Sequence, residues 1–293
     1  MKHLFIKSPA KINLYLDVLS KRKDGYHNLL TFFERISLFD KIYLKITDKE
    51  KGIKLCCNKK GIPCGSDNLA YKAAVLIRED FDITSGLRID LVKNIPSGAG
   101  LGGASSNAAM TLLGLNRLYN LKLSRKKLFV YARKIGSDVN FFLLEKSFAL
   151  AKDKGDVFLP IRGLKTDKIW HLLLIPKKKI LTKNIYKTLN LKKNKSLTRS
   201  LKNVRLMTYA LEKKDNSLLS RAIYNKLEEV TLKKLVEIGR IKYKLKALGV
   251  DCSLMSGSGP AVFGIVHTRK EALRLKREFI QIKDLDSFVV STF

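Results

Sequence analysis

Residues Lys93 to Met110, KNIPSGAGLGGASSNAAM, combine a glycine-rich loop with the start of a run of helix-forming residues. Closely spaced glycines let a backbone approach a ligand, and the first turn of a helix presents unpaired N–H groups to an anion. The segment therefore predicts a phosphate-binding loop, with a glycine turn and an ordinary serine cap as the alternative. The residues of this predicted cradle are Pro96, Gly98, Ala99, Gly100, Leu101, Gly102, Gly103, Ser105 and Ser106.

Three common phosphate loops differ in the residues that accompany the glycines. A dinucleotide loop needs an acidic residue roughly 20 positions further on, whereas no Asp or Glu occurs between Ala104 and Ser137. A Walker loop ends in Gly-Lys-Ser/Thr, and this loop has no such lysine. The protein-kinase companions V-A-I-K, H-R-D and D-F-G are also missing. A strand, a glycine loop and a helix remain.

A phosphate cradle without its own lysine needs a cation and a carboxylate from elsewhere in the chain. Lys11 lies beside Asn13 on one face of a predicted strand, and Asp138 lies in KIGSDVNFFL, just past a predicted helix end. A lysine next to an aspartate keeps the carboxylate ionised, so that it can orient or deprotonate a hydroxyl group. Read alone, Lys11 is typical of a solvated strand and Asp138 of a cap or turn.

The hydrophobic pattern indicates the elements that position these residues. KINLYLDVL places Ile12, Leu14, Leu16 and Val18 on one face, which predicts a half-buried strand. SDNLAYKAAVLIRED predicts a helix capped by Ser66 or Asp67. Further helices are predicted over 104–119 and over LSRKKLFVYARKIG, the latter ended by Gly136. The segment 141–161 is strand-like, and 168–211 contains two basic helices after an initial strand. The C-terminal region is predicted as strand, turn, strand, helix and strand.

The bulk composition indicates a globular chain. Its 293 residues, 45% of them hydrophobic, suffice for one large domain or two ordinary ones. No apolar run is long enough to cross a membrane and no secretory signal is apparent, so we expect a cytoplasmic protein. The four cysteines and four histidines lack the spacing of a metal site. The net charge of +32 is compatible with nucleic-acid binding, although solvated lysines are the simpler explanation.

Three ordered motifs, SPAKINL, IPSGAGLGGASSNAA and LMSGSGPAVFGIV, resemble those of the GHMP small-molecule kinases. KDGYHNLLTFF, SDNLAYKAA and GSDVNFFL narrow the resemblance to a branch with a cytidyl diphosphate substrate. The resemblance covers nearly the whole chain. It implies an α+β, two-domain GHMP kinase fold with the active site in the cleft between the domains. The implied domains are a ribosomal-protein-like βαβ domain that binds ATP (1–160) and a ferredoxin-like α/β domain (161–293).

The resemblance also implies an activity. ATP would phosphorylate the 2-hydroxyl group of a cytidyl-diphosphate methylerythritol in the non-mevalonate (MEP) pathway of isoprenoid biosynthesis. Lys11 and Asp138 fall on the catalytic pair, and the glycine loop falls on the triphosphate cradle. Gly257, Ser258 and Gly259 would close the site near the phosphates. Mg²⁺ is expected to accompany ATP, but the sequence does not identify its ligands.

The remaining implied residues bind the substrate. Asn13 falls on a substrate-orienting position. Tyr26 and His27 match a cytosine site, in which an aromatic ring stacks on the base and a histidine bonds its edge. Tyr186 aligns with the second aromatic residue that stacks on the base. Thr182 lies on the same side of the implied site, which we call the substrate wall. The chain departs from the family near Asp138: Asn140 stands where the family usually has proline, which would loosen the loop.

Two alternatives stay open. The first is a GHMP kinase for another small alcohol, of the mevalonate or homoserine type, although those lack the Gly-Tyr-His turn. The second is a non-enzymatic RNA-binding protein, suggested by the charge. RNA-binding surfaces usually interleave aromatic and basic residues, and the acid-free stretch 168–211 has few aromatics. We therefore expect small-molecule partners, no membrane partner and no nucleic acid.

Overall fold

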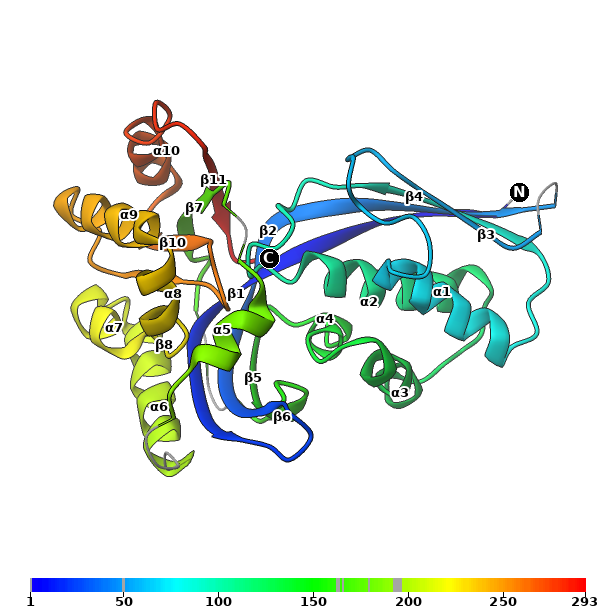
Figure 1. The fold of residues 1–293 in the computed structure, drawn as a ribbon, viewed down its shortest axis with the longest axis horizontal. Helices are drawn as coiled ribbons and strands as arrows, with labels where there is room; N and C mark the ends of the chain where they lie inside the picture. Colours follow the sequence, from blue (N-terminus) through cyan, green and yellow to red (C-terminus); the bar gives the residue numbers. More distant parts are fainter. Residues whose placement is uncertain (1, 49–50, 162–163, 165, 179, 192–196) are drawn as a thin grey trace. The chain divides into compact units, whose positions relative to one another are not determined.

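The computed structural model describes residues 2–48, 51–161, 164, 166–178, 180–191 and 197–293 (Figure 1). The strands are β1 (His3–Lys21), β2 (His27–Thr47), β3 (Ile53–Cys57), β4 (Gly86–Val92), β5 (Phe148–Asp153), β6 (Val157–Leu159), β7 (Trp170–Pro176), β8 (Tyr224–Asn225), β9 (Ser253–Met255), β10 (Val262–Val266) and β11 (Leu285–Ser291). The helices are α1 (Leu69–Asp80), α2 (Gly103–Leu118), α3 (Arg125–Ile135), α4 (Val139–Leu143), α5 (Thr182–Thr188), α6 (Leu197–Lys213), α7 (Asn216–Ala222), α8 (Glu228–Lys234), α9 (Val236–Ala247) and α10 (Arg269–Arg277).

The chain forms two compact units that interleave along the sequence. Unit 1 contains Met1–Ala10, Leu38–Ser97 and Gly102–Lys146, and unit 2 contains Lys11–Ser37, Gly98–Leu101 and Ser147–Phe293. The long strands β1 and β2 each contribute one half to either unit. The mixed α+β content agrees with the predicted fold class, whereas the predicted domain boundary at residue 160 stays a prediction.

Unit 1 contains a small sheet with helices on one face. The second half of β2 pairs with β4 in antiparallel fashion, and β3 pairs with β4 in parallel. Helices α1 and α2 lie side by side against this sheet (Figure 1). A Cβ atom at Gly114 of α2 would come within 2.6 Å of the side chains of Leu44 and Ile6. This glycine therefore allows α2 to lie directly on the strands.

Unit 2 contains the first half of β2, which pairs antiparallel with β5, and β6 pairs with β5. The short β8 pairs in parallel with β1. A separate four-stranded antiparallel sheet has the order β11-β7-β10-β9. Its buried residues pack with the apolar faces of α9 and α10, which include Ile238, Ile241 and Leu275. The predicted C-terminal order of strand, turn, strand, helix and strand is confirmed.

The prediction that β1 is half-buried is wrong. Ile12 and Leu14 are buried as expected, but Lys11 (4% exposed), Asn13 (1%) and Asp17 (3%) on the other face are buried as well. These polar groups have bonding partners: the Ser200 hydroxyl donates to Asp17 (2.8 Å), for example. Burying polar side chains costs free energy unless they find such partners, so the polar face of β1 is a candidate for a functional site.

Most predicted helices are present, with two local corrections. Helix α1 begins after Asn68, not Ser66 or Asp67, because the Asn68 Oδ1 accepts the N–H of Ala70 (2.9 Å). The first residues of the strand-like segment 141–161 belong to the short helix α4, and only its later part forms β5 and β6. Its apolar run is buried (Phe141 and Phe142 are 0% exposed), and a short buried run does not distinguish a helix from a strand.

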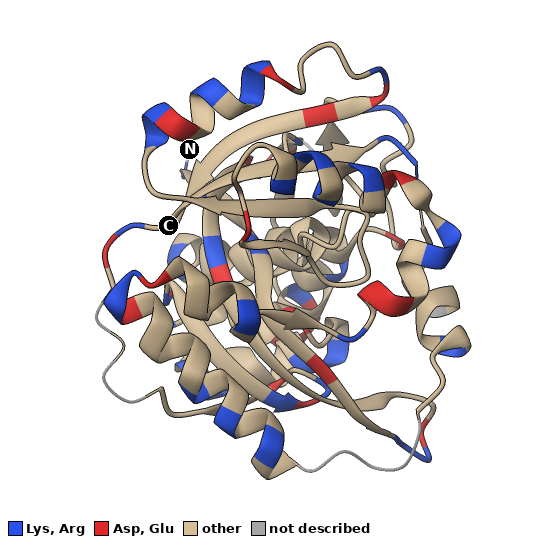
Figure 2. Cartoon of the chain, turned by 90° about the vertical axis from the view of Figure 1, so that its left-hand side faces the viewer, with Lys and Arg blue, Asp and Glu red and all other residues tan. Residues whose placement is uncertain are grey.

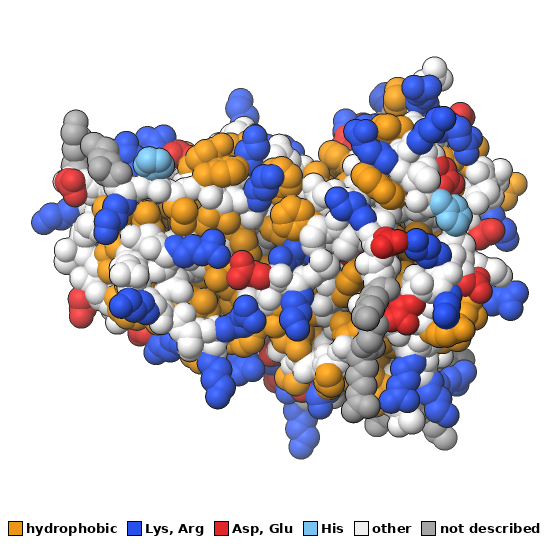
Figure 3. All heavy atoms as spheres, turned by 180° about the vertical axis from the view of Figure 1, so that it is seen from behind, with side chains coloured by type: hydrophobic (Ala, Val, Ile, Leu, Met, Phe, Trp, Pro, Cys, Tyr) orange, Lys and Arg blue, Asp and Glu red, His pale blue; other side chains and the backbone are white. Residues whose placement is uncertain are grey.

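The positive charge is spread over the surface. Figure 2 shows Lys and Arg on most of the helices in view, with fewer Asp and Glu among them. On the face drawn in Figure 3, basic side chains project from many places and do not form one stripe. Within the part of the chain that the structure describes, no helix is long and apolar enough to cross a membrane.

Candidate active site

Lys11 and Asn13 are buried polar residues of unit 2 that contact each other. The Lys11 Nζ donates to the Asn13 Oδ1 (2.6 Å) and lies over the ring of Phe33, 5.2 Å from its centroid. The Asn13 Nδ2 in turn donates to the hydroxyl of Thr31 (2.7 Å). The predicted neighbours Lys11 and Asn13 are thus in direct contact, on the buried polar face of β1.

The glycine loop enters unit 2 through residues 98–101. The Lys11 N–H donates to the carbonyl of Leu101 (3.0 Å), and the Ala261 N–H donates to that of Ala99 (3.2 Å). Gly100 has φ +78°, and a Cβ atom there would lie 2.3 Å from the carbonyl oxygen of Ser256. The predicted loop and the predicted C-terminal turn are therefore in contact, at a distance that only glycine permits.

The C-terminal turn lies close to the same residues. A Cβ atom at Gly257 would lie 3.1 Å from the Gly100 carbonyl oxygen and 3.5 Å from the Asn13 Oδ1. The Ser256 hydroxyl donates to the Gly100 carbonyl (3.1 Å) and accepts the Asn13 N–H (3.3 Å). Asn225 supports the turn, since its Nδ2 donates to the carbonyls of Met255 (2.7 Å) and Gly257 (2.8 Å).

Helix α2, in unit 1, continues the loop. Its N-cap is Gly102, with φ +67°, and no side chain caps the helix. The uncapped N-terminus of a 16-residue helix offers N–H groups and a positive dipole end to an anion. Ser105 is half-buried in the first turn, whereas the Ser106 hydroxyl is fully buried and accepts a hydrogen bond from Ser8 (2.8 Å).

A buried ion pair supports the loop from within unit 1. Lys93 (5% exposed) pairs with Asp40 (0%) and also donates to the Asn107 Oδ1 (2.9 Å). The other oxygen of Asp40 accepts the N–H groups of Asn94 (2.7 Å) and Ile95 (2.8 Å). Asp40 thereby fixes the backbone immediately before the loop to the first turns of α2.

Asp138 is the N-cap residue of α4, but its side chain makes no capping hydrogen bond. Read from the sequence alone, Asp138 is most simply a helix cap. In the structure its carboxylate accepts no hydrogen bond from the backbone N–H groups of α4. Asp138 belongs to unit 1 and Lys11 to unit 2. Their pairing stays a prediction.

Asn140, two residues after Asp138, is buried in α4 (1% exposed). Neither its Oδ1 nor its Nδ2 has a hydrogen-bond partner among the described residues. A buried amide without partners loses its hydration and gains nothing in return. The departure from proline at this position therefore carries a cost in stability.

Replacing Asn140 with leucine is expected to raise the free energy of unfolding by about 1–2 kcal/mol, because it removes the unpaired amide while keeping the volume. Chemical denaturation measures the change. Asn116→Leu is the matched control, since the Asn116 amide bonds both the N–H (2.9 Å) and the carbonyl (3.2 Å) of Leu123. That control should lower stability. An Asn140→Leu variant as destabilised as the control would contradict the argument.

The predicted cytosine-site residues lie in unit 2. The rings of His27 and Tyr186 are 5.1 Å apart between centroids and tilted by 30°. Burial, and secondarily the charge of Lys21, lowers the pKa of His27 below its ordinary value, so its imidazole is neutral at pH 7. The Thr182 hydroxyl lies 2.8 Å from that of Ser258, which joins the predicted substrate wall to the C-terminal turn.

Tyr26 is 57% exposed, and one face of its ring is covered. The Lys154 Nζ lies 4.2 Å from the ring centroid and 2.9 Å from the carboxylate of Asp24, which also accepts the Tyr26 N–H (3.1 Å). The hydrogen bond from Lys154 is the largest cause of the fall in the pKa of Asp24 to about 2. Lys154 and Asp24 thus orient an aromatic ring that keeps an open face.

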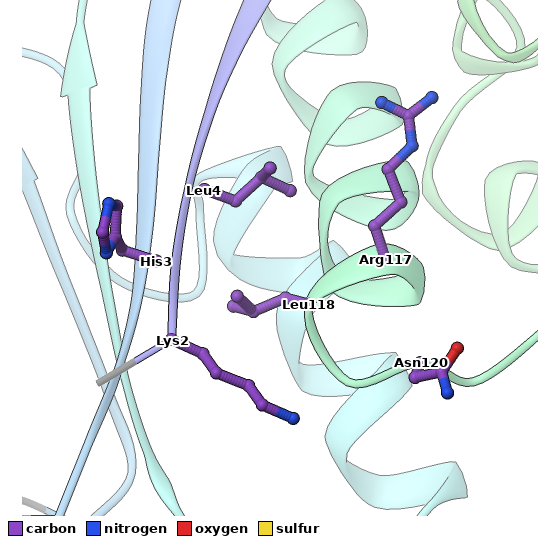
Figure 4. A pocket seen from close by; sticks show the side chains of 6 residues that line it. All are labelled: Lys2, His3, Leu4, Arg117, Leu118 and Asn120. Carbon is purple, nitrogen blue, oxygen red and sulfur yellow. The ribbon is translucent and has the colours of Figure 1, made fainter.

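Elsewhere in the described residues we find no cluster of metal-ligating side chains, and a hollow in unit 1 lacks polar groups that converge. No group of three or more His, Cys, Asp and Glu side chains is placed to hold a metal ion. A hollow of about 410 Å³ in unit 1 is lined by Lys2, His3, Leu4, Arg117, Leu118 and Asn120. Its basic side chains point in different directions, so they do not converge on one ligand (Figure 4).

Several residues of this arrangement are not among those predicted from the sequence. Thr31, Ser256 and Asn225 form hydrogen bonds to segments that are distant in the sequence. Thr31 and Ser256 lie inside KDGYHNLLTFF and LMSGSGPAVFGIV, but neither residue is among the predicted site residues. Asp40 and Lys93 are likewise ordinary strand residues in sequence. Lys93 has a usable signal, because it is the first residue of the glycine-rich segment Lys93–Met110.

Two family models match the chain. The model described as "GHMP kinases N terminal domain" matches residues 68–146, which contain the glycine loop and Asp138. The model described as "GHMP kinases C terminal" matches residues 207–283, which contain the C-terminal turn. Together with the α+β fold, these matches show that the chain belongs to the GHMP kinases, a family of small-molecule phosphotransferases.

Within that family the chain resembles one group along its whole length. It is 43% identical over 263 residues to 4-diphosphocytidyl-2-C-methyl-D-erythritol kinase of Geobacillus kaustophilus (strain HTA426), covering 90% of this chain and 88% of the relative. The enzyme of that name from Clostridium novyi (strain NT) is 38% identical over 291 residues, covering 99% of this chain and 100% of the relative. A crystal structure of a 4-(cytidine 5′-diphospho)-2C-methyl-D-erythritol kinase superposes with a TM-score of 0.82 at 31% identity, covering 99% of this chain and 100% of that chain.

Other GHMP kinases share the architecture. Solved structures of a homoserine kinase from Cytophaga hutchinsonii and a mevalonate kinase from Methanococcus jannaschii each superpose with a TM-score of 0.72 at 19% identity. The superpositions cover 95% of the homoserine kinase chain and 98% of the mevalonate kinase chain. Similarity at this level shows the fold alone.

Proposed function

We propose that the protein transfers the γ-phosphoryl group of ATP to the 2-hydroxyl group of 4-diphosphocytidyl-2-C-methyl-D-erythritol, in non-mevalonate isoprenoid biosynthesis. The full-length similarity to kinases of that name supports the substrate. The single structural observation that favours it is the His27–Tyr186 ring pair, in the same unit as Lys11, Asn13 and Gly100. A neutral imidazole and an aromatic ring suit a cytosine base.

ATP is proposed to bind through its phosphates at the glycine loop and the uncapped start of α2. Backbone N–H groups and a helix dipole bind phosphate without a lysine in the loop. Mg²⁺ is proposed to arrive with ATP, since this ion keeps several waters and takes much of its coordination from the phosphates. A kinase that consumes ATP is expected to work in the cytoplasm.

The chemistry is proposed to use Lys11 and Asp138. Asp138 would accept or direct the proton of the attacking hydroxyl group, and Lys11 would keep this carboxylate ionised and offset the charge that develops on the phosphoryl group. Phosphoryl transfer depends mainly on positioning and charge stabilisation. The contact of Lys11 with Asn13 supports a fixed position for the ammonium group.

The proposed activity is tested by incubating the protein with ATP, Mg²⁺ and the cytidyl diphosphate substrate and following ADP by phosphorus NMR. ADP should form together with a new phosphomonoester signal, and omission of the substrate should abolish both. Mevalonate and homoserine serve as competing acceptors. Turnover of either one in place of the cytidyl substrate would overturn the assignment within the family.

His27→Ala is expected to raise the KM for the cytidyl substrate by about 10- to 100-fold, the range for loss of a hydrogen bond and part of a stacking surface. The KM for ATP should change less than about threefold, because the nucleotide loop is a different segment. His267→Ala is the control, since His267 is exposed and its ring bonds the side chain of Asn216 (2.8 Å), away from the predicted substrate residues in sequence. Equal effects on both KM values would favour another acceptor.

A further inference from the structure

Thr31 lies in β2 and is 1% exposed; it belongs to the motif KDGYHNLLTFF but is not among the site residues predicted from the sequence. Its hydroxyl makes two hydrogen bonds. It donates to the main-chain carbonyl of Tyr15 (2.9 Å) and accepts from the Nδ2 of Asn13 (2.7 Å). Both partners lie in β1, the strand that also carries Lys11.

The donor count at Thr31 fixes which way the Asn13 amide faces. A carbonyl oxygen can only accept, so the bond to Tyr15 uses the single proton of the Thr31 hydroxyl. Thr31 can then only accept from Asn13, which requires the Nδ2 on that side. The Oδ1 is consequently turned toward Lys11, whose ammonium group can only donate. The bond to Thr31 and the bond from Lys11 therefore require the same orientation of the Asn13 amide.

We propose that Thr31 is a positioning residue for the phosphoryl transfer: its hydroxyl locks the amide of Asn13, and the amide oxygen holds the ammonium group of Lys11 in place. This inference rests on the proposed function for its kinetic consequence only. The remaining contacts of the pair are consistent with a rigid arrangement. The Ser256 hydroxyl accepts the Asn13 N–H, and the ring of Phe33 lies beside the Lys11 ammonium group.

The hydrogen bond from Asn13 to Thr31 should affect kcat more than either KM. Both hydrogen bonds of the Thr31 hydroxyl go to β1, and its link to the predicted site residues passes through Asn13. A small displacement of a catalytic group can cost up to about 100-fold in rate. Loss of the Thr31 hydroxyl should therefore lower kcat and leave both KM values nearly unchanged.

Thr31→Val removes the hydroxyl and keeps the β-branched shape, while the main-chain pairing of Thr31 with Ala151 of β5 does not depend on the side chain. We expect kcat to fall about 10- to 30-fold, with each KM within about threefold of wild type. Thr31→Ser retains the hydroxyl and should recover most of the loss. A Thr31→Val enzyme with wild-type kcat, or a Thr31→Ser enzyme as slow as the valine variant, overturns the proposal.

A double-mutant cycle separates positioning from a general structural effect. In a Lys11→Met background there is no ammonium group to hold, so adding Thr31→Val should lower kcat by less than about twofold. An equal fold-loss in both backgrounds would show that Thr31 acts independently of Lys11. Thermal unfolding of each variant confirms that it is folded at the assay temperature.

The hydrogen bond itself can be tested without enzyme activity. In ¹⁵N-labelled protein, the side-chain amide protons of Asn13, assigned with an Asn13→Asp variant, should exchange slowly with solvent in wild type and Thr31→Ser. Thr31→Val should speed the exchange by about tenfold or more and shift the resonance. Unchanged exchange in Thr31→Val overturns the inference. Absence of ADP formation by the wild type, with the predicted exchange behaviour, would instead count against the proposed function alone.

Discussion

Replacing Asp40 with alanine is expected to lower the free energy of unfolding by about 3–5 kcal/mol, the range for breaking a buried ion pair from one side. The ammonium group of Lys93 would stay buried without its carboxylate, because both side chains are almost inaccessible. The N–H groups of Asn94 and Ile95 would lose their acceptor as well. Since these amides immediately precede the glycine loop, activity should fall even at temperatures at which the variant is folded.

Asp90→Ala is the matched control for this prediction. Asp90 pairs with Arg88 on β4 of the same unit, at 2.8 Å, but the two side chains are 37% and 47% exposed. An exposed pair contributes at most about 1 kcal/mol. Urea denaturation of the two variants compares a buried with an exposed aspartate in one unit. Equal losses would show that burial does not decide the strength of the Asp40 pair.

The features that could be predicted from the sequence are those set by local pattern. The helix after the glycines, the strand at Trp170 and the C-terminal strand-turn-strand are all predicted from residue periodicity and turn residues, and the structure contains them. The resemblance to the family predicts His27 and Tyr186 as two substrate residues, and their rings lie 5.1 Å apart although the residues are far apart in sequence; their role stays a prediction. Motif order thus carried information that periodicity does not contain.

The features that could not be predicted are set by contacts between distant segments. β1 alternates like a half-buried strand, yet its polar face is buried because Thr31, Ser200 and Ser256 supply partners from elsewhere in the chain. The cap of α1 is one or two residues later than predicted because Ser, Asp and Asn are similarly good caps and occur in succession. The interleaving of the two units arises because β1 and β2 are long enough to serve both.

Asp40 and Thr31 have related roles in this respect. Each is a buried polar residue of β2 that bonds to a segment carrying predicted site residues: Asp40 to the backbone before the glycine loop, and Thr31 to Asn13. Buried polar groups are costly unless fully bonded, so such positions tolerate few substitutions. The strand β2 therefore supports predicted site residues within each unit, although it carries only His27 of the residues predicted from the sequence.

Gly100→Ala is expected to abolish most of the activity, with a loss in kcat/KM of about 100-fold or more, because the loop can no longer approach the C-terminal turn. The new Cβ atom would lie 2.3 Å from the Ser256 carbonyl oxygen and 3.2 Å from the Gly259 nitrogen. These are backbone atoms, which cannot turn aside as a flexible side chain would. The loop must shift, and the bonds at Ala99 and Leu101 shift with it.

Gly98→Ala separates this contact from backbone strain. Gly98 has a similar φ, +71° against +78°, but a Cβ atom there would meet nothing within 4 Å. Both variants carry the cost of a left-handed conformation, about 1–2 kcal/mol, and only Gly100→Ala adds the collision. Steady-state kinetics and denaturation of the two proteins should therefore differ widely. If the two variants lose activity equally, the left-handed backbone and not the contact with Ser256 is what the loop requires of its glycines.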